Sequence, residues 1–302
     1  MQRSLQRQAF TRGTPPDKPS ASSPQELAGR FPQHSVSLSK VINVQTTMEA
    51  ACEAARAGGK ILREQLGRAA VREKGPADLV TDADIASQHA IEQILTARFP
   101  HFAFLGEEST EQDRQAARDS GKPLWVVDPL DGTANFVHRL LSFSVSIALV
   151  EEDQTRIGVV YDPMLDVLYA AEAGGRVTKN GKPIRVSGCQ QIDKAMVCCS
   201  FRPGVNREDP EVENFLRILE RSQSLRRLGS AALNLCYVGE GCLDSYWATS
   251  VKAWDVAAGY LIAQTAGATL SQMDGSAFDL WNPKFVASGS PELQKTMLGC
   301  MY

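Results

Sequence analysis

The sequence lacks the long apolar runs, cysteine pairs and histidine clusters that mark several classes of protein. No apolar run reaches the roughly 18 residues that a membrane-spanning helix requires, so we expect no membrane partner. The seven cysteines form no CxxC pair. An odd number of cysteines suits a disulfide framework poorly, so we interpret them as free thiols in a reducing compartment. The four histidines are scattered, and we interpret each as structural or as part of the surface.

The sequence also has little net charge of either sign. Charged residues make up 22% of the 302 residues, hydrophobic residues 43%, and the net charge is −3. This composition is typical of a globular protein and excludes a collagen, a coiled coil or a disordered polymer for most of the chain. A weakly negative chain is poorly suited to hold a nucleic-acid polymer or an anionic membrane, so we expect neither as a partner.

Residues 1–45 differ from the rest of the chain. They have no hydrophobic period and contain a Pro15-Pro16 pair, which favours a disordered tail. Within the first 40 residues, two acidic residues stand against six basic ones: Arg3, Arg7, Arg12, Lys18, Arg30 and Lys40. This excess of arginine over acid is also compatible with an organelle transit segment. We therefore expect a cytoplasmic protein or, as the alternative, one of an organelle matrix.

From residue 46 onward, hydrophobic spacing predicts helices that alternate with strands. Thr46 and Glu49 fit a capping box at the start of the first helix. Further helices are expected over 84–99, 210–220, 230–238, 255–266 and 291–298. Strands are expected over 102–105, 124–127, 143–149, 157–161, 167–171, 243–248, 268–272 and 285–287. This alternation predicts a mixed α and β fold, which we divide into an N-terminal metal-binding domain over 46–185 and a C-terminal domain over 186–302.

One run of residues carries the strongest chemical signal. A buried apolar strand, 124–127, leads directly into Asp128-Pro129-Leu130-Asp131. Because Pro129 cannot continue a strand ladder, we expect the chain to turn there and the two carboxylates to converge, with the Leu130 carbonyl between them. Oxygen ligands of this kind suit Mg²⁺. A helix beginning at Gly132 would add free N–H groups, which favour a phosphate.

Three other segments place acids at the ends of strands or the starts of helices. Glu107 and Glu108 follow a short apolar strand, Asp84 lies at the start of a predicted helix, and Asp255 opens another. Each has a plain alternative: solvated surface for the Glu pair, and helix capping for Asp84 and Asp255. Taken functionally, they would ligate a metal ion or orient a water molecule.

Three motifs together resemble the inositol monophosphatase family of Mg²⁺-dependent, lithium-sensitive phosphatases. They are Gly106-Glu107-Glu108-Ser109, the run from Asp128 to Phe136, and the run from Trp254 to Gly259. The resemblance covers roughly residue 48 to the C-terminus. It implies an α+β fold, the layered α-β-α-β-α sandwich of the inositol monophosphatase and fructose-1,6-bisphosphatase type, and a homodimer.

The resemblance also implies roles for individual residues. Two or three Mg²⁺ ions would be held by Glu107, Asp128, the Leu130 carbonyl, Asp131 and Asp255. Thr133, paired with Asp84, would orient the attacking water, and Glu108 would act as a second acid beside Glu107. The phosphate and substrate would rest on Gly132, Thr133, Ser230, Ala231 and Asp255. No protein nucleophile is required.

The spacing of the acids disfavours a different class of phosphatase. Haloacid dehalogenase-like enzymes use Asp-x-Asp-Gly-Thr with an aspartyl nucleophile, whereas two residues separate Asp128 from Asp131. A non-catalytic module that binds metal or phosphate is the remaining alternative outside the enzymes.

The substrate stays open at this point. A phosphorylated polyol such as inositol monophosphate is the first expectation. Animal inositol monophosphatases, however, carry an inositol-binding glutamate where this chain has Ala248. Histidinol phosphate, fructose 1,6-bisphosphate and 3′-phosphoadenosine 5′-phosphate are therefore alternatives, and Lys252 would favour a second anionic group.

Overall fold

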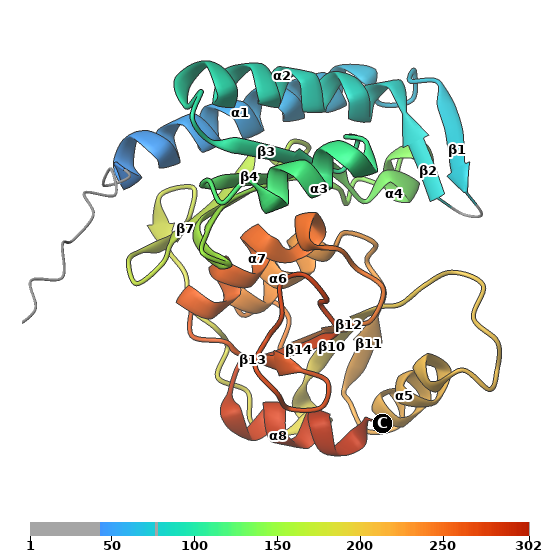
Figure 1. Cartoon of the computed structure of the whole chain (residues 1–302). Helices are drawn as coiled ribbons and strands as arrows, with labels where there is room; N and C mark the ends of the chain where they lie inside the picture. The colour runs from blue at the N-terminus through green and yellow to red at the C-terminus, as the bar shows by residue number, and fades with distance from the viewer. Residues whose placement is uncertain (1–42, 76–77, 302) are drawn as a thin grey trace, which may run out of the picture. The chain divides into compact units, whose positions relative to one another are not determined.

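The computed structural model describes residues 43–75 and 78–301, which form five alternating layers of helix and sheet (Figure 1). Helices α1 (Val44–Gln65) and α2 (Asp82–Arg98) pack on one face of a seven-stranded sheet. Helices α6 (Ala231–Gly239) and α7 (Ala253–Thr265) fill the space between this sheet and a five-stranded one. Helices α5 (Pro210–Leu219) and α8 (Pro291–Cys300) cover the outer face of the second sheet. The α-β-α-β-α sandwich expected from the sequence is confirmed.

The seven-stranded sheet has its strands in chain order, from β3 to β9. Strands β3 and β4 are parallel, and all later pairs are antiparallel. The strands are β3 (Ala103–Gly106), β4 (Leu124–Asp131), β5 (Ser144–Glu151), β6 (Gln154–Asp162), β7 (Val167–Glu172), β8 (Val177–Lys179) and β9 (Lys182–Pro183). Both faces of β4 and β5 are buried because helices cover the sheet on each side.

The five-stranded sheet runs β11-β10-β12-β14-β13. Strand β10 (Met196–Ser200) is parallel to β11 (Ser224–Arg226) and β12 (Ser245–Ala248). Strand β14 (Phe285–Ser288) is antiparallel to β12 and to β13 (Thr269–Gln272). The division of the chain into two domains at residue 185 remains a prediction.

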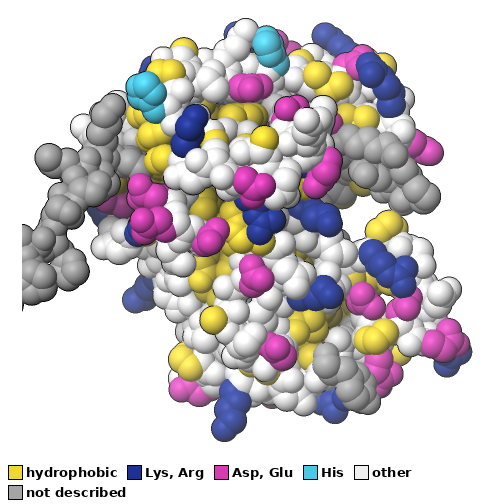
Figure 2. Space-filling view, viewed as in Figure 1, with side chains coloured by type: hydrophobic (Ala, Val, Ile, Leu, Met, Phe, Trp, Pro, Cys, Tyr) yellow, Lys and Arg dark blue, Asp and Glu magenta, His cyan; other side chains and the backbone are white. Residues whose placement is uncertain are grey.

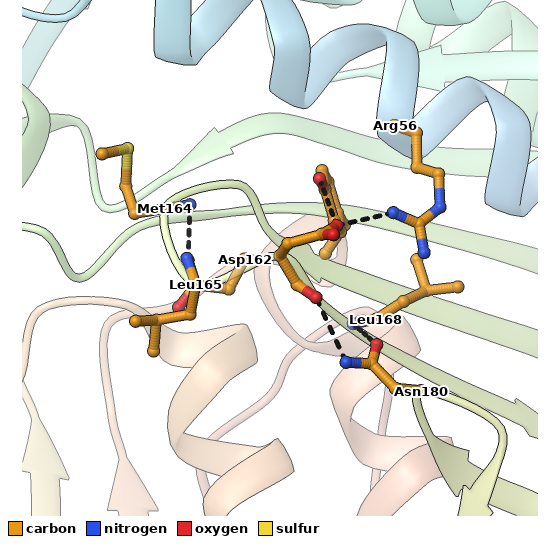
Figure 3. Close-up of polar contacts among 8 residues, drawn as sticks. Arg56, Asp162, Met164, Leu165, Leu168 and Asn180 are labelled. Atoms are coloured by element: carbon orange, nitrogen blue, oxygen red, sulfur yellow. Dashed lines mark hydrogen bonds and ion pairs between the residues drawn. The ribbon is translucent and has the colours of Figure 1, made fainter.

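The turn residues Asp162-Pro163 and Asn180-Gly181, which predict hairpins, each stand between two paired antiparallel strands, and the first of these hairpins is tied to helix α1. Asp162 Oδ1 accepts hydrogen bonds from the backbone N–H groups of Met164 and Leu165, at 2.9 and 3.0 Å, which shapes the β6–β7 turn (Figure 3). Arg56 of α1 donates to Asp166 at 2.7 Å. Asn180 and Gly181, both with positive φ, form the β8–β9 turn.

Two expected boundaries are wrong. Helix α1 begins at Val44, and its N-cap is Asn43, whose side chain accepts a hydrogen bond from Thr46 N at 3.2 Å. Thr46 therefore lies inside the first turn and cannot cap the helix, because asparagine is a strong N-cap one turn earlier. Strand β4 does not stop before Pro129; it continues to Asp131 through a register shift after Asp128.

Several elements were not expected from the sequence. They are helix α3 (Glu111–Asp119), a hairpin of β1 (Val71–Gly75) and β2 (Asp78–Thr81), a short 3₁₀ helix (Ile192–Lys194) and strands β10 and β11. Helix α4 (Thr133–Val137) stands where a helix was expected from Gly132. All seven cysteines are free, as predicted. Within the described residues, no helix is long and apolar enough to cross a membrane.

Candidate active site

The irregular end of β4 places Asp128 in the interior of the molecule. The side chain is buried, with only 2% of the residue exposed, and its Oδ1 accepts a hydrogen bond from Leu130 N at 2.9 Å. Asp128 pairs with Ser146 of β5 before the register shift, and Asp131 pairs with Ser144 after it. The two residues skipped by the ladder, Pro129 and Leu130, form an irregularity within β4 between the two carboxylates, where a turn ending the strand was expected.

Asp131 joins β4 to the start of α6. Its carboxylate accepts hydrogen bonds from Ala231 N at 3.0 Å and Ala232 N at 2.8 Å, and from the hydroxyl of Ser230. Ser144 Oγ donates to the same carboxylate at 3.3 Å. A carboxylate at a helix N-terminus is stabilised by the exposed N–H groups and by the helix dipole. The predicted metal ligand Asp131 and the predicted substrate residues Ser230 and Ala231 are thus in direct contact.

Asp255 lies in the first turn of α7, where its Oδ2 accepts a hydrogen bond from Lys252 N at 2.8 Å. Burial and the nearby charge of Asp131 raise the pKa of Asp255 to about 7. Burial, followed by the charges of Glu107, Asp131 and Asp255, raises the pKa of Asp128 well above its ordinary value. Buried carboxylates that repel one another in this way are stabilised by a bound cation.

Asp84 caps helix α2 and also contacts Thr133. Its Oδ2 accepts from Thr81 N at 2.9 Å and from Thr81 Oγ1 at 2.5 Å, which forms the capping box of α2. Its Oδ1 is 3.3 Å from the hydroxyl of Thr133, as the predicted pair requires. Burial, together with the charge of Glu108, raises the pKa of Asp84 to about 6 even though the hydrogen bonds from Thr81 lower it.

Glu107 and Glu108 lie in the turn that follows β3. The turn is held by Glu107 N, which donates to Val127 O at 3.0 Å, and by Glu108 N, which donates to the side chain of Gln88 at 2.9 Å. Gly106 precedes them, and a Cβ there would lie 2.2 Å from the Gln88 amide oxygen. A side chain at this position would displace the Gln88 amide that holds Glu108 N, and the turn brings both acids beside the end of β4.

Two glycines with positive φ bring the loops of the site together. Gly132, with φ of 99°, is the N-cap of α4, and Gly229, with φ of 91°, precedes Ser230. Asn135 donates through Nδ2 to Ser142 O and to Leu228 O, both at 2.7 Å. A Cβ on Gly229 would lie 2.5 Å from the Asn135 amide nitrogen.

Helix α4 begins at Thr133, one residue later than expected.

A cavity of about 550 Å³ opens beside Glu107, between α3 and the start of α7. Its walls include acidic and basic side chains as well as two indole rings, those of Trp254 and Trp281. Figure 2 shows charged side chains interspersed with an apolar strip on this face of the molecule. The cavity is therefore suited to a polar ligand larger than a phosphate ion.

The donor chemistry of the site fits a hard divalent cation. As they stand, no three His, Cys, Asp or Glu side chains within residues 43–75 and 78–301 converge closely enough to hold a metal ion. The carboxylates of Asp131 and Asp255 accept hydrogen bonds from backbone N–H groups at the starts of α6 and α7. The donors are nevertheless all oxygens, and the raised pKa values show that the carboxylates repel one another.

Sequence reasoning missed four residues that shape this site. Thr81 could have been found, because a threonine three residues before Asp84 matches a capping box. Asn135 stands within the quoted motif, although its contacts to the 228–229 loop are tertiary. Ser144 and Arg114 have no signal in the sequence, because their partners belong to other elements.

Comparison with known proteins agrees with this geometry. Residues 43–300 match the model of the inositol monophosphatase family. An inositol-1-monophosphatase of Mesorhizobium japonicum is 35% identical over 85% of this chain and 93% of its own length. Inositol monophosphatase 2 of Solanum lycopersicum is 39% identical over 80% of this chain and 93% of its own.

Solved structures share the same fold. The extragenic suppressor protein suhB of Bartonella henselae superposes with a TM-score of 0.77 and 31% identity, over 84% of this chain and 98% of that one. A structure described as IMPase/NADP phosphatase with Mg²⁺ and phosphate superposes with a TM-score of 0.75 and 25% identity, over 85% and 95%. The chain belongs to the inositol monophosphatase family.

Proposed function

We propose that this phosphatase hydrolyses a small phosphorylated polyol of the inositol monophosphate type and requires Mg²⁺. The observation that carries the proposal is the group of Asp128, Asp131 and Asp255, of which the first two are buried and all three have raised pKa values. A buried group of carboxylates is costly for the fold unless it serves a cation. The relative described with Mg²⁺ and phosphate supports the same assignment.

The residues that would hold two or three Mg²⁺ ions are Glu107, Asp128, Asp131, Asp255 and the Leu130 carbonyl. Bound Mg²⁺ would lower the pKa of a water molecule and neutralise charge on the phosphoryl oxygens. The N–H groups of Gly132 and Thr133 would hold the phosphate at the start of α4. The leaving alcohol would lie near Ser230, Ala231 and Asp255.

Thr133 and Asp84 would position the attacking water. The Thr133 hydroxyl lies 3.3 Å from Asp84 Oδ1 and 3.1 Å from Leu130 O, so the hydroxyl proton has two acceptors within the protein. With that proton directed inward, the hydroxyl oxygen is free to accept a hydrogen bond from water. Glu108, whose negative charge raises the pKa of Asp84, would be the second acid beside Glu107.

A second candidate is a phosphatase of the same fold that acts on a larger or doubly anionic metabolite. Ala248, fully buried in β12, cannot accept the hydrogen bonds of inositol hydroxyls. The cavity beside Glu107 is lined by Arg118 and Lys252, whose charges suit a second anionic group. The relative described as an NADP phosphatase supports this alternative.

One panel tests both candidates. Phosphate release would be measured from inositol 1-phosphate, histidinol phosphate, fructose 1,6-bisphosphate and 3′-phosphoadenosine 5′-phosphate, with Mg²⁺ and with Mg²⁺ plus Li⁺. We expect the highest kcat/KM for inositol 1-phosphate, and inhibition by Li⁺. A preference for another substrate would favour the second candidate. Absence of release from every substrate would leave a non-catalytic binding module.

We also propose a homodimer. Leu140 and Leu141, which follow α4, are 57% and 53% exposed. Adjacent exposed leucines are typical of a surface that contacts another protein chain. Light scattering after size exclusion measures the mass directly, and a monomer at micromolar concentration would contradict the proposal.

The location of the protein, in the cytoplasm or in an organelle matrix, stays a prediction. Residues 1–42, which would form the transit segment, lie outside the described part of the chain. Imaging of the full chain in cells, compared with a chain that lacks these residues, tests whether they direct it to an organelle.

A further inference from the structure

Arg114, on α3, is the centre of a set of contacts beside the proposed metal site. Its Nη1 donates to the backbone carbonyls of Glu107, at 2.6 Å, and Ser109, at 2.9 Å. Its Nη2 donates to Glu111 at 2.7 Å, and its Nε to the same oxygen at 3.2 Å. Only 22% of the Arg114 side chain is exposed. The guanidinium is thus held by several bonds in one orientation, which a surface arginine seldom achieves.

The other side of this guanidinium faces the segment that carries Asp255. The Arg114 guanidinium carbon lies 5.2 Å from the centre of the Trp254 ring, which is within the range of a cation–π interaction. Trp254 is itself anchored, because its carbonyl accepts a hydrogen bond from Ser146 Oγ at 3.1 Å. Ser146 is the residue paired with Asp128 across β4 and β5.

These contacts link three of the proposed metal ligands. The turn of Glu107 is bonded to Arg114, Arg114 stacks on Trp254 next to Asp255, and Trp254 is bonded to the strand beside Asp128. Groups that hold metal ligands in place commonly affect metal affinity 10- to 100-fold when they are removed. Nothing in the pattern of the sequence pointed to Arg114.

We propose that Arg114 is a positioning residue, which holds the Glu107 turn against Trp254 and so keeps Glu107 at a fixed spacing from Asp255 before a cation binds. The proposal rests on the proposed function, since it concerns the same metal site. In this role Arg114 acts through the backbone of Glu107 and the ring of Trp254.

The test is Mg²⁺ binding to the substrate-free full chain, measured by isothermal titration calorimetry. We expect R114Q to raise the Kd for Mg²⁺ about tenfold, because the turn loses its donors. R114K keeps the charge but not the planar set of donors, and we expect it to restore only part of the affinity. In kinetics, the Mg²⁺ concentration for half-maximal rate should rise while kcat at saturating Mg²⁺ stays within about twofold of wild type.

Arg118 supplies a matched control. It lies on the same helix and stacks on Trp281, with its guanidinium carbon 4.1 Å from the ring centre. We expect R118Q to leave the Kd for Mg²⁺ unchanged. E111Q is a second variant that should leave folding intact, because the Glu111 side chain is 82% exposed. It removes the negative charge that orients Arg114 from outside while keeping an acceptor oxygen, so we expect a rise of about threefold in Kd, below that of R114Q.

The outcomes separate this inference from the proposed function. If the wild-type chain binds Mg²⁺ and R114Q and E111Q bind it equally well, the positioning role of Arg114 is wrong while the metal site stands. Equal losses in R114Q and R118Q would also overturn it, since they would indicate a general effect on α3. If the wild-type chain binds no Mg²⁺, the proposed function fails first.

Discussion

The carboxylate of Asp131, at the end of β4, accepts a hydrogen bond from Ala232 N, in the first turn of α6, at 2.8 Å. The two residues are 101 positions apart in the chain. The contact joins the seven-stranded sheet to the helical layer between the two sheets. The proposed metal site therefore lies at a junction of layers, and changes at this junction should affect both stability and catalysis.

Ser230 tests this junction. The Ser230 hydroxyl caps α6 by accepting a hydrogen bond from Leu233 N at 3.2 Å, and it also donates to Asp131. The S230A variant loses both hydrogen bonds. We expect a loss of about 1–2 kcal/mol in the free energy of unfolding, measured by urea denaturation, and a lower kcat/KM. S290A is the control, because Ser290 caps α8 in the same way, at 3.1 Å from Leu293 N, in the outer layer. For S290A we expect a similar loss of stability but unchanged activity. Equal activity in S230A and S290A would contradict the role of Ser230 in the site.

Asp128 should show opposite effects on activity and on stability. D128N keeps an oxygen that can accept from Leu130 N, but it removes a buried charge from beside Glu107, Asp131 and Asp255. Because a carboxyl whose pKa is raised by folding destabilises the fold at every pH above its ordinary pKa, we expect a higher Tm than wild type in EDTA at pH 7. With Mg²⁺, phosphate release should fall by more than about 100-fold.

A second buried aspartate controls for the chemistry of this change. Asp162 also accepts backbone hydrogen bonds, in the β6–β7 turn, and burial raises its pKa. D162N should retain activity near that of wild type. Wild-type turnover by D128N would overturn the metal assignment.

The pH dependence of catalysis should report Asp84. Its carboxylate has a pKa raised to about 6, and we expect that it must be ionised to accept the hydrogen bond from the Thr133 hydroxyl. As the pH falls through about 6 the carboxylate is protonated, so kcat/KM at saturating Mg²⁺ should fall about tenfold for each pH unit below that value. The fall should be absent from the residual activity of D84N. An unchanged acidic limb in D84N would assign it to another group.

Gly229 should be intolerant of any side chain. In G229A the new methyl would meet the Asn135 amide at 2.5 Å, in a backbone with φ of 91°. We expect a loss of more than the roughly 1–2 kcal/mol that positive φ alone costs, together with reduced activity because Ser230 is displaced. The matched control is G174A, since Gly174 has φ of 67° and no atom within 4 Å of the added carbon. Thermal unfolding of the two variants measures the difference, and equal losses would show that the contact with Asn135 is unimportant.

Local chemistry in the sequence determined much of this protein. The run from Leu124 to Thr133 predicted a buried strand with an interruption at Pro129, because both depend on neighbouring residues. The hairpin at Asn180-Gly181 and the cap at Ser290 were predictable for the same reason. The family resemblance supplied the order of the layers, which hydrophobic spacing alone would have left open.

Contacts between distant segments were decided only by the tertiary structure. Asn43 displaced Thr46 as the cap of α1, since two good caps compete and sequence spacing does not rank them. The contact of Asp131 with α6, that of Asn135 with the 228–229 loop, and the stacking of Arg114 on Trp254 join elements that are far apart in the chain. Their geometry depends on how whole layers pack, and a local pattern carries no information about that packing.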